Sequence, residues 1–114
     1  RPAPEYDGAN LDKVVKINGS CIVTLANENG EEFVITYDQK AMTLTCDRSN
    51  CGKTDFSPHF KTVATAPVQR KLTSMRIFVD NSSIEVFGNN GEVCLTSLVF
   101  PSAPLTTLTT TKMK

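Results

Sequence analysis

Hydrophobic and polar positions alternate along most of this chain, a pattern that predicts strands rather than helices. No stretch of ten or more residues repeats its apolar positions with the 3.6-residue period of a helix, and the ordered-looking segments are rich in Val, Ile, Thr and Phe. The predicted strands are Lys13–Ile17, Cys21–Ala26, Glu32–Tyr37, Ala41–Cys46, Val63–Ala66, Leu72–Asp80, Ile84–Phe87, Val93–Phe100 and Thr106–Met113. Short strands at this spacing indicate an all-β sandwich.

The turns between these strands define the pairing best in the stretch from Leu72 to Phe100. A two-residue turn at Asn81-Ser82 places Val79 opposite Ile84 and Phe78 opposite Glu85. A second two-residue turn at Asn90-Gly91 places Phe87 opposite Cys94. The core face of this predicted meander then carries Ile77, Val79, Ile84 and Val86, and its other face carries Arg76, Phe78, Glu85, Phe87, Leu98 and Phe100.

That second face is amphipathic, and it contains too many large apolar side chains to be left wholly in water. Arg76 and Glu85 are diagonal neighbours on it, and we expect them to form an ion pair over the aromatic rings. The four large apolar side chains of the face predict that a second sheet or another domain covers it.

Two segments lack this alternation. Turn-forming residues without a period run from Asp47 to Phe60, so we expect a long ordered loop or corner there. The Thr-rich run at 106–111 is biased in composition, but Thr favours strands, which predicts an edge strand.

Composition and charge exclude several classes of function. The 114 residues include 12 basic and 12 acidic side chains, so the net charge is zero and neither sign gathers into a block. We therefore expect no nucleic-acid partner and no anionic membrane partner. The absence of Trp disfavours a sugar-binding platform of exposed rings. No apolar run approaches the length of a membrane span, and the start at Arg1 reads as a cut within a longer protein.

The four cysteines are expected to be free thiols. A tetrahedral zinc site takes four ligands, usually in two closely spaced pairs, but these cysteines do not form two such pairs and His59 is the single histidine. Neither a zinc site nor any other metal or cofactor is therefore predicted. Cys21 and Cys94 fall within apolar strands, where we expect both to be buried as small hydrophobic residues. Four residues separate Cys46 from Cys51, and the sequence leaves the disulfide status of all four cysteines open.

Residues with the chemistry of hydrolysis are present but not in a catalytic pattern. Asp80 and Glu85 are the tempting carboxylate pair, yet they flank a hairpin turn and are expected to face opposite sides, so we assign them structural roles. Asp47 and Arg48 fit a corner ion pair, or a contact across a domain boundary. His59 stands in a loop without a nucleophile elbow anywhere in the chain. No catalytic residue is predicted.

One family shares the motifs of this chain. Residues 75–93, MRIFVDNSSIEVFGNNGEV, followed by Leu95-Thr96-Ser97 and Phe100-Pro101, resemble the C-terminal β-sandwich of glycoside hydrolase family 32, the invertase, levanase and inulinase group. Upstream motifs of the same domain follow in the same order: Tyr37-Asp38, Leu44, Asp47-Arg48-Ser49, Gly52, Phe56-Ser57-Pro58, Phe60 and Ala66-Pro67. The resemblance runs from Cys21 to Pro101, with residues 1–20 as a poorly matching lead-in that lacks a convincing first strand.

The resemblance implies an antiparallel two-sheet β-sandwich of the jelly-roll or concanavalin-like kind, slightly truncated, as the C-terminal domain of a larger enzyme. In that family an N-terminal five-bladed β-propeller holds the active site, with an Asp nucleophile, an Arg-Asp-Pro motif and a Glu-Cys acid/base. None of these motifs occurs here, and Asp47-Arg48 is followed by Ser49 rather than Pro. The implied parent is an exo-acting, retaining β-fructosidase; its preference among sucrose, levan and inulin and its export stay open.

Three functions are compatible with these sequence features. The leading hypothesis is a noncatalytic domain that supports the propeller of its own chain and, as in some relatives, forms homodimer contacts. The second is a fructan-binding module, for which Phe78 and Tyr37 are the aromatic candidates. A stand-alone enzyme is the third. The residues predicted to make interdomain or sugar contacts are Asp47, Arg48, Arg76, Phe78, Glu85 and Phe87.

Overall fold

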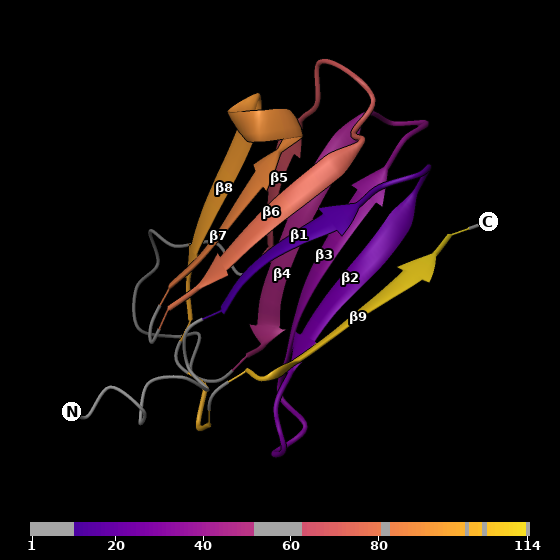
Figure 1. Cartoon of the computed structure of the whole chain (residues 1–114). Helices are drawn as coiled ribbons and strands as arrows, with labels where there is room; N and C mark the ends of the chain where they lie inside the picture. The colour runs from indigo at the N-terminus through magenta and orange to yellow at the C-terminus, as the bar shows by residue number, and fades with distance from the viewer. Residues whose placement is uncertain (1–10, 52–62, 81–82, 100, 104, 114) are drawn as a thin grey trace.

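The computed structural model describes residues 11–51, 63–80, 83–99, 101–103 and 105–113, and within them nine strands form two antiparallel sheets. The strands are β1 (Leu11–Lys16), β2 (Cys21–Ala26), β3 (Glu32–Asp38), β4 (Thr43–Asn50), β5 (Val63–Pro67), β6 (Ser74–Val79), β7 (Ser83–Gly88), β8 (Val93–Leu98) and β9 (Thr107–Lys112). A turn of 3-10 helix, η2 (Asn89–Gly91), joins β7 to β8. Figure 1 shows the two sheets stacked face to face, so the predicted sandwich is confirmed.

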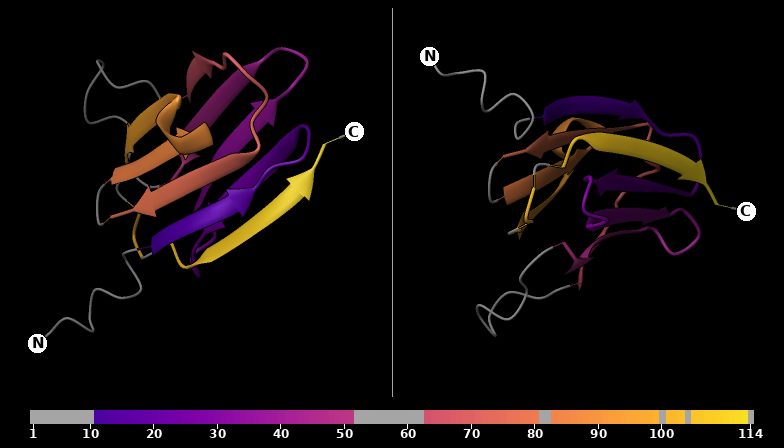
Figure 2. Two further views of the ribbon diagram at one scale, coloured as in Figure 1. Left: turned by 45° about the horizontal axis from the view of Figure 1, so that its top comes forward. Right: turned by 90° about the horizontal axis from the view of Figure 1, so that it is seen from below.

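The strand order shows how the chain passes between the layers. One sheet has the order β1-β6-β7-β8 and the other β5-β4-β3-β2-β9. The chain therefore changes sheets after β1, after β5 and after β8. The edge strands β1 and β9 belong to different sheets but lie along the same flank of the sandwich (Figure 2).

The core is the layer between the sheets, and the predicted alternation builds it. In β2, β3 and β7 every second residue is buried while the residues between them are only partly covered. The fully enclosed side chains come from both sheets and include Val23, Leu25, Phe33, Ile35, Tyr37, Leu44, Met75, Ile77, Ile84 and Val86. A period of two thus places one apolar face of each sheet against the other.

The pairing predicted within the meander is confirmed. Val79 lies opposite Ile84, Phe78 opposite Glu85 and Phe87 opposite Cys94. The second turn differs from the prediction: the strands join through η2 and Glu92 rather than through a two-residue Asn90-Gly91 turn. The Glu92 N–H donates to the carbonyl of Gly88 at 2.9 Å, which closes the longer connection without changing the register. Residues 81 and 82, the first predicted turn, lie outside the described residues.

Two other expectations need correction, and one more is confirmed. β4 continues to Asn50, so Asp47 and Arg48 lie in a strand and not at the start of a loop, because Asp47 still pairs with Val34 and with Val63. The rest of the predicted loop, including His59, lies mostly outside the described residues. The lead-in does contain a first strand, since β1 pairs with β6 over six residues. The Thr-rich run forms the predicted edge strand, β9, against β2.

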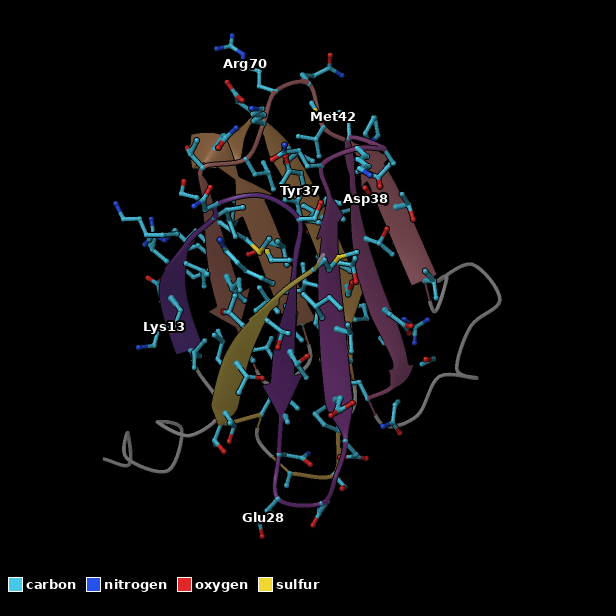
Figure 3. All side chains as sticks on the ribbon, turned by 90° about the vertical axis from the view of Figure 1, so that its right-hand side faces the viewer. Lys13, Glu28, Tyr37, Asp38, Met42 and Arg70 are labelled. Carbon is cyan, nitrogen blue, oxygen red and sulfur yellow. The ribbon has the colours of Figure 1, made fainter. Side chains whose placement is uncertain are left out.

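A buried hydrogen bond holds the crossing from β5 to β6. The Leu72 N–H donates to the Tyr37 hydroxyl at 3.1 Å, and both residues are enclosed. Tyr37 lies among the side chains between the sheets, whereas Lys13, Glu28 and Arg70 lie at the periphery (Figure 3). The ring of Tyr37 lies wholly inside the core. Tyr37 is therefore unable to stack against a sugar, the role for which the sequence made it a candidate.

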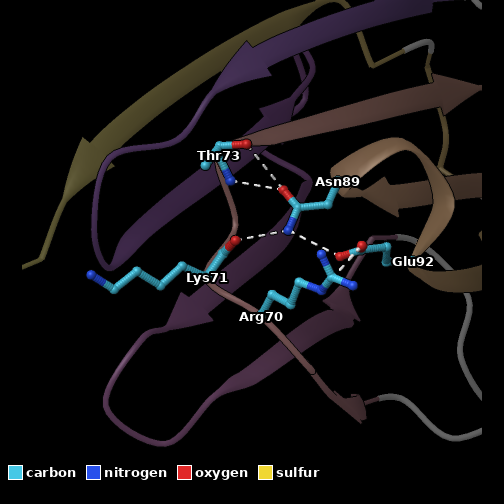
Figure 4. A network of polar contacts seen from close by, with 5 residues as sticks. All are labelled: Arg70, Lys71, Thr73, Asn89 and Glu92. Carbon is cyan, nitrogen blue, oxygen red and sulfur yellow. Dashed lines mark hydrogen bonds and ion pairs between the residues drawn. The ribbon is translucent and has the colours of Figure 1, made fainter.

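The same crossing is held at the surface by Asn89, whose φ of 48° lies in the left-handed region. Its side-chain Oδ1 accepts from the Thr73 N–H at 2.8 Å, and its Nδ2 donates to the Lys71 carbonyl at 2.7 Å. Glu92 accepts from the same amide at 3.4 Å and approaches Arg70 at 3.6 Å (Figure 4). One side chain thereby attaches the connection between the sheets to η2.

A second polar cluster holds the crossing from β8 to β9. The Glu31 carboxylate accepts from the Ser102 N–H at 2.7 Å, from the Ser102 hydroxyl at 2.9 Å and from Asn27 Nδ2 at 2.9 Å. Asn27 Nδ2 also donates to the Ala103 carbonyl at 2.9 Å. These bonds attach residues far along the chain to the β2–β3 hairpin, and they hold the pKa of Glu31 below its ordinary value.

We predict that Tyr37→Phe lowers the free energy of unfolding by about 1–3 kcal/mol, because the volume of the ring is kept while the buried Leu72 N–H loses its acceptor. Urea unfolding followed by far-UV circular dichroism measures the change. Thr45→Val is the control, since it removes an exposed hydroxyl paired only with Thr65, and should change stability by less than about 0.5 kcal/mol. Equal effects of the two variants would contradict this role for the buried bond.

Candidate functional site

The outer face of the four-stranded sheet brings together four of the six predicted contact residues. Phe78 lies opposite Glu85, and Arg76 lies opposite Phe87, on strands β6 and β7. The rings of Phe78 and Phe87 meet edge to face with centroids 5.8 Å apart, and the Arg76 guanidinium lies 4.6 Å from the centre of the Phe78 ring. Both aromatic side chains are half-buried, so each keeps an accessible surface.

Arg76 pairs with Asp12 of β1 and not with Glu85 as the sequence predicted. Its Nε donates to Asp12 Oδ1 at 3.0 Å and its Nη2 donates to Oδ2 at 2.8 Å, a two-point contact. Hydrogen bonding and charge from Arg76 lower the pKa of Asp12, and Asp12 raises the pKa of Arg76. The pairing of β1 with β6, which places Asp12 opposite Phe78, brings this carboxylate close to Arg76.

Phe78 separates two shallow hollows on this face. The larger, of about 500 Å³, is lined by Leu11, Asp12, Phe78, Val79, Asp80, Ser83 and Glu85. The smaller, of about 230 Å³, is lined by Arg76, Phe78, Phe87 and Gly91. Asp80 and Glu85 line the same hollow, so the expectation that they face opposite sides is wrong. Carboxylates beside one aromatic ring can accept hydrogen bonds from hydroxyl groups while the ring packs against an apolar face.

Asp47 and Arg48, the other two predicted contact residues, belong to the five-stranded sheet and do not join this face. Asp47 accepts from the Ser49 N–H at 2.8 Å, and Arg48 is buried with 2% of its surface exposed. The Cys51 N–H donates to the Arg48 carbonyl at 3.1 Å, which places the buried Cys51 beside this strand end. The two residues thus lie near the end of β4, away from the outer face of the four-stranded sheet.

The cysteines are free in the structure, and three of them are buried. Burial raises the pKa of Cys46 to about 12, with a smaller contribution from Cys94, and raises the pKa of Cys51 to about 11, where Glu31 adds to the shift and Arg48 opposes it. Such thiols are poor nucleophiles at neutral pH. Cys94 is exposed, contrary to prediction, because its side of β8 is the outer face.

No group of three or more His, Cys, Asp or Glu side chains able to hold a metal ion is found among the described residues. In that part of the chain there is also no helix with the length and apolar character needed to cross a membrane.

Asp12 is the member of the outer face that the sequence argument missed. It lies 64 residues before Arg76, in a strand whose partner was not predicted. The only available signal was the alternation of β1 itself, which places Asp12, Val14 and Lys16 on one side without showing which strand they join.

Comparison with known proteins identifies the family. Residues 14–113 match the family described as glycosyl hydrolases family 32 C terminal. The chain belongs to this family. The match is wider than the resemblance from Cys21 to Pro101 and takes in part of β1 and the whole of β9.

Similar proteins carry glycosidase names. A levanase of Bacillus sp. (strain L7) is 38% identical over 79 residues, which cover 68% of this chain and 9% of that protein. A levanase of Bacillus subtilis (strain 168) is 41% identical over 71 residues, 59% of this chain and 10% of that protein. The family 32 chain thus spans about a tenth of the length of these relatives.

Solved structures agree with the fold. The exo-inulinase from Aspergillus awamori has a TM-score of 0.64 at 26% identity, covering 91% of this chain and 25% of that one. The Bombyx mori β-fructofuranosidase has a TM-score of 0.65 at 21% identity, covering 93% of this chain and 23% of that one. In both cases the family 32 domain described here corresponds to about a quarter of a larger chain.

We predict that the Asp12–Arg76 pair contributes stability near neutral pH and loses it in acid. Because the folded state lowers the pKa of Asp12, the contribution is present above the unfolded pKa of about 3.9 and disappears as the pH falls through the lower folded value. Asp12→Asn should therefore be less stable than the wild type at pH 7, with a difference that shrinks below about pH 4.

Urea unfolding at several pH values, in low salt, measures this difference. Arg76→Gln and the double variant complete a double-mutant cycle, in which the coupling between the two residues should fade over the same pH range and in high salt. A difference between wild type and Asp12→Asn that is the same at pH 3 and pH 7 would contradict the assignment.

Proposed function

We propose that this chain is a noncatalytic accessory domain of a β-fructosidase, and that it stabilises an N-terminal five-bladed propeller of the same polypeptide. The parent enzyme would hydrolyse terminal β-D-fructofuranosides of sucrose, levan or inulin, in keeping with the names of its relatives. The catalytic motifs that the family resemblance implies are absent from the 114 residues, which supports a role without chemistry of its own.

The observation that carries this proposal is the outer face of the four-stranded sheet. Phe78 and Phe87 are only half-covered there, and Val14 on the neighbouring strand is 62% exposed. Apolar surface gathered on one side of a sheet is typical of a surface that another domain covers. The Asp12–Arg76 pair lies among these side chains and could remain satisfied within such an interface.

The position at which the polypeptide enters the sandwich supports the same assignment. β1 begins at Leu11, and Leu11 itself lines the larger hollow on this face. A domain that precedes this one in the polypeptide would be joined, through residues 1–10, to the strand that borders the outer face. The homodimer that the sequence analysis admits need not compete with this docking, because free edges are also present in the other sheet.

We predict that Phe78→Ser and Phe87→Ser destabilise the full-length polypeptide more than they destabilise the 114-residue chain. The additional loss should be about 1 kcal/mol for each ring, because docking buries the part of the ring that the isolated domain leaves exposed. Denaturant unfolding of both forms measures the difference, with each variant compared with its own wild type.

Val63→Ser is the matched control, since Val63 is an exposed apolar residue (45%) on the five-stranded sheet. It should change the two forms equally. Two results would overturn the proposal: equal effects of the Phe variants in both forms, or hydrolysis of sucrose or levan by the 114-residue chain at a rate comparable to the full-length enzyme.

A second candidate function is fructan binding at the same face. Two hollows that share the Phe78 ring would suit consecutive sugar units, with Asp12, Asp80 and Glu85 as acceptors for hydroxyl groups. The docking role ranks first because Phe78 and Phe87 are the only side chains among the lining residues with an aromatic ring, and neither lies fully open to solvent.

Isothermal titration of the 114-residue chain with levan, inulin and fructose separates the two functions. The docking proposal predicts no measurable heat with any of them. Binding heat that is lost in Phe78→Ala and kept in Val63→Ala would instead assign the hollows to a saccharide. Tyr37 is not a useful test position, because its ring is buried and its replacement would damage the core.

A further inference from the structure

The edge strand β9 presents a row of backbone groups for which the described structure has no partner. β9 is the last strand of its sheet, and it pairs on one side with β2 over six residues. The Met113 N–H donates to the Ser20 carbonyl at 3.0 Å, so Met113 and Ser20 form a hydrogen-bonded pair at the end of this ladder. Such pairs alternate in antiparallel strands, so the N–H and C=O groups of Leu108, Thr110 and Lys112 point away from β2.

Two of the other three edge strands, β1 and β5, carry features that discourage pairing, whereas β9, like the uncharged β8 (VCLTSL), has few of them. β1 has three charged residues, Asp12, Lys13 and Lys16, in six positions, and β5 is short and ends in Pro67. β9 reads TLTTTK and contains no Pro, no break in its register with β2, and one charge at its last position. Edge strands normally avoid further pairing through charges, prolines and bulges.

We propose that β9 is a dimerisation strand, and that two copies of this chain pair their β9 strands antiparallel about a two-fold axis at Thr110. The two five-stranded sheets would then join into one continuous sheet across the dimer. An interface around a two-fold axis uses the same surface on both copies, so the strand must be complementary to itself.

The register of β9 satisfies this condition. With Thr110 opposite Thr110 of the second copy, Leu108 lies opposite Lys112, and all three residues with outward backbone groups find partners, giving about six hydrogen bonds. Thr109 then lies opposite Thr111 on the outer side of the sheet, a pair of β-branched hydroxyl side chains that is favourable across strands.

Charge does not oppose this register. Each Lys112 is aligned with Leu108 of the second copy, four positions from the other Lys112, which corresponds to about 14 Å along the strands. That separation exceeds the screening length of about 10 Å at 0.1 M salt. A register centred on Lys112 would bring the two ammonium groups together, so the charge at the end of the strand also selects the central register.

The flank beside β9 is open in the way a dimer contact requires. Thr110 and Lys112 lie opposite the buried Val23 and Cys21, on the core side of the sheet, yet both are exposed. Lys13 of β1 is likewise opposite the buried Ile77 and exposed. Core-side residues of both layers are therefore exposed along this flank, and a second copy could approach the edge of β9.

Sedimentation equilibrium of the 114-residue chain tests the proposal, with a dimer of twice the 12.5 kDa monomer mass as the expected result. Thr110→Pro removes an outward N–H from both copies while leaving the ladder to β2 without a lost donor, and should raise the dissociation constant by at least about tenfold. Val14→Pro is the matched control, because its N–H points outward from the other edge on this flank, and it should leave the dimer intact.

A wild-type chain that stays monomeric at high concentration would overturn the proposal, as would a dimer that persists in Thr110→Pro or dissociates in Val14→Pro. If Thr110→Pro does not fold, amide hydrogen exchange of the wild type decides. The amides of Leu108, Thr110 and Lys112 should become protected as the concentration rises, and exchange that is independent of concentration would exclude β9 as the contact. These outcomes leave the docking role of the four-stranded sheet untouched, because β9 lies in the other sheet.

Discussion

Packing of the two sheets against each other is the constraint on which this structure depends. Each sheet has one continuous apolar face, and neither meander could bury that face alone. The alternation in β2, β3 and β7 is strict enough that a slip of one residue would turn the core outward. The packing of these two apolar faces therefore determines the fold, and the connections between the sheets are arranged to allow it.

Those connections are held by polar side chains that bond to backbone groups. Tyr37 holds the crossing before β6 from inside the core, and Asn89 holds it from the surface. Asn27 and Glu31 hold the crossing before β9 through Ser102 and the neighbouring carbonyl. Irregular backbone needs such partners, because its own N–H and C=O groups lie outside the ladders. The polypeptide can thus pass from one sheet to the other while its connecting segments remain hydrogen-bonded.

The surfaces that this packing leaves exposed are the basis of the proposed functions. The outer face of the four-stranded sheet keeps Phe78 and Phe87 half-exposed beside a charged pair, whereas the edge of the five-stranded sheet at β9 is almost without charge. We propose the first surface as the contact with a neighbouring domain and the second as the contact with a second copy of the chain. Membership of glycosyl hydrolases family 32 supports the proposal of a neighbouring domain, since the relatives are several times longer than this chain.

Local pattern determined much of this protein from the sequence alone. The period of two and the turn residues predicted the strands from β2 to β9, with β4 too short at its end, and they set the register between Phe78 and Glu85, because neighbours in a hairpin pair through short turns. Only the tertiary structure decided that β1 pairs with β6. As a result, the partner of Arg76 is Asp12 and not the predicted Glu85. The tertiary structure also decided that Cys94 faces outward on an edge strand. Pairing between strands distant in sequence depends on which apolar faces pack together, and the hydrophobic periodicity within one strand does not predict its partner.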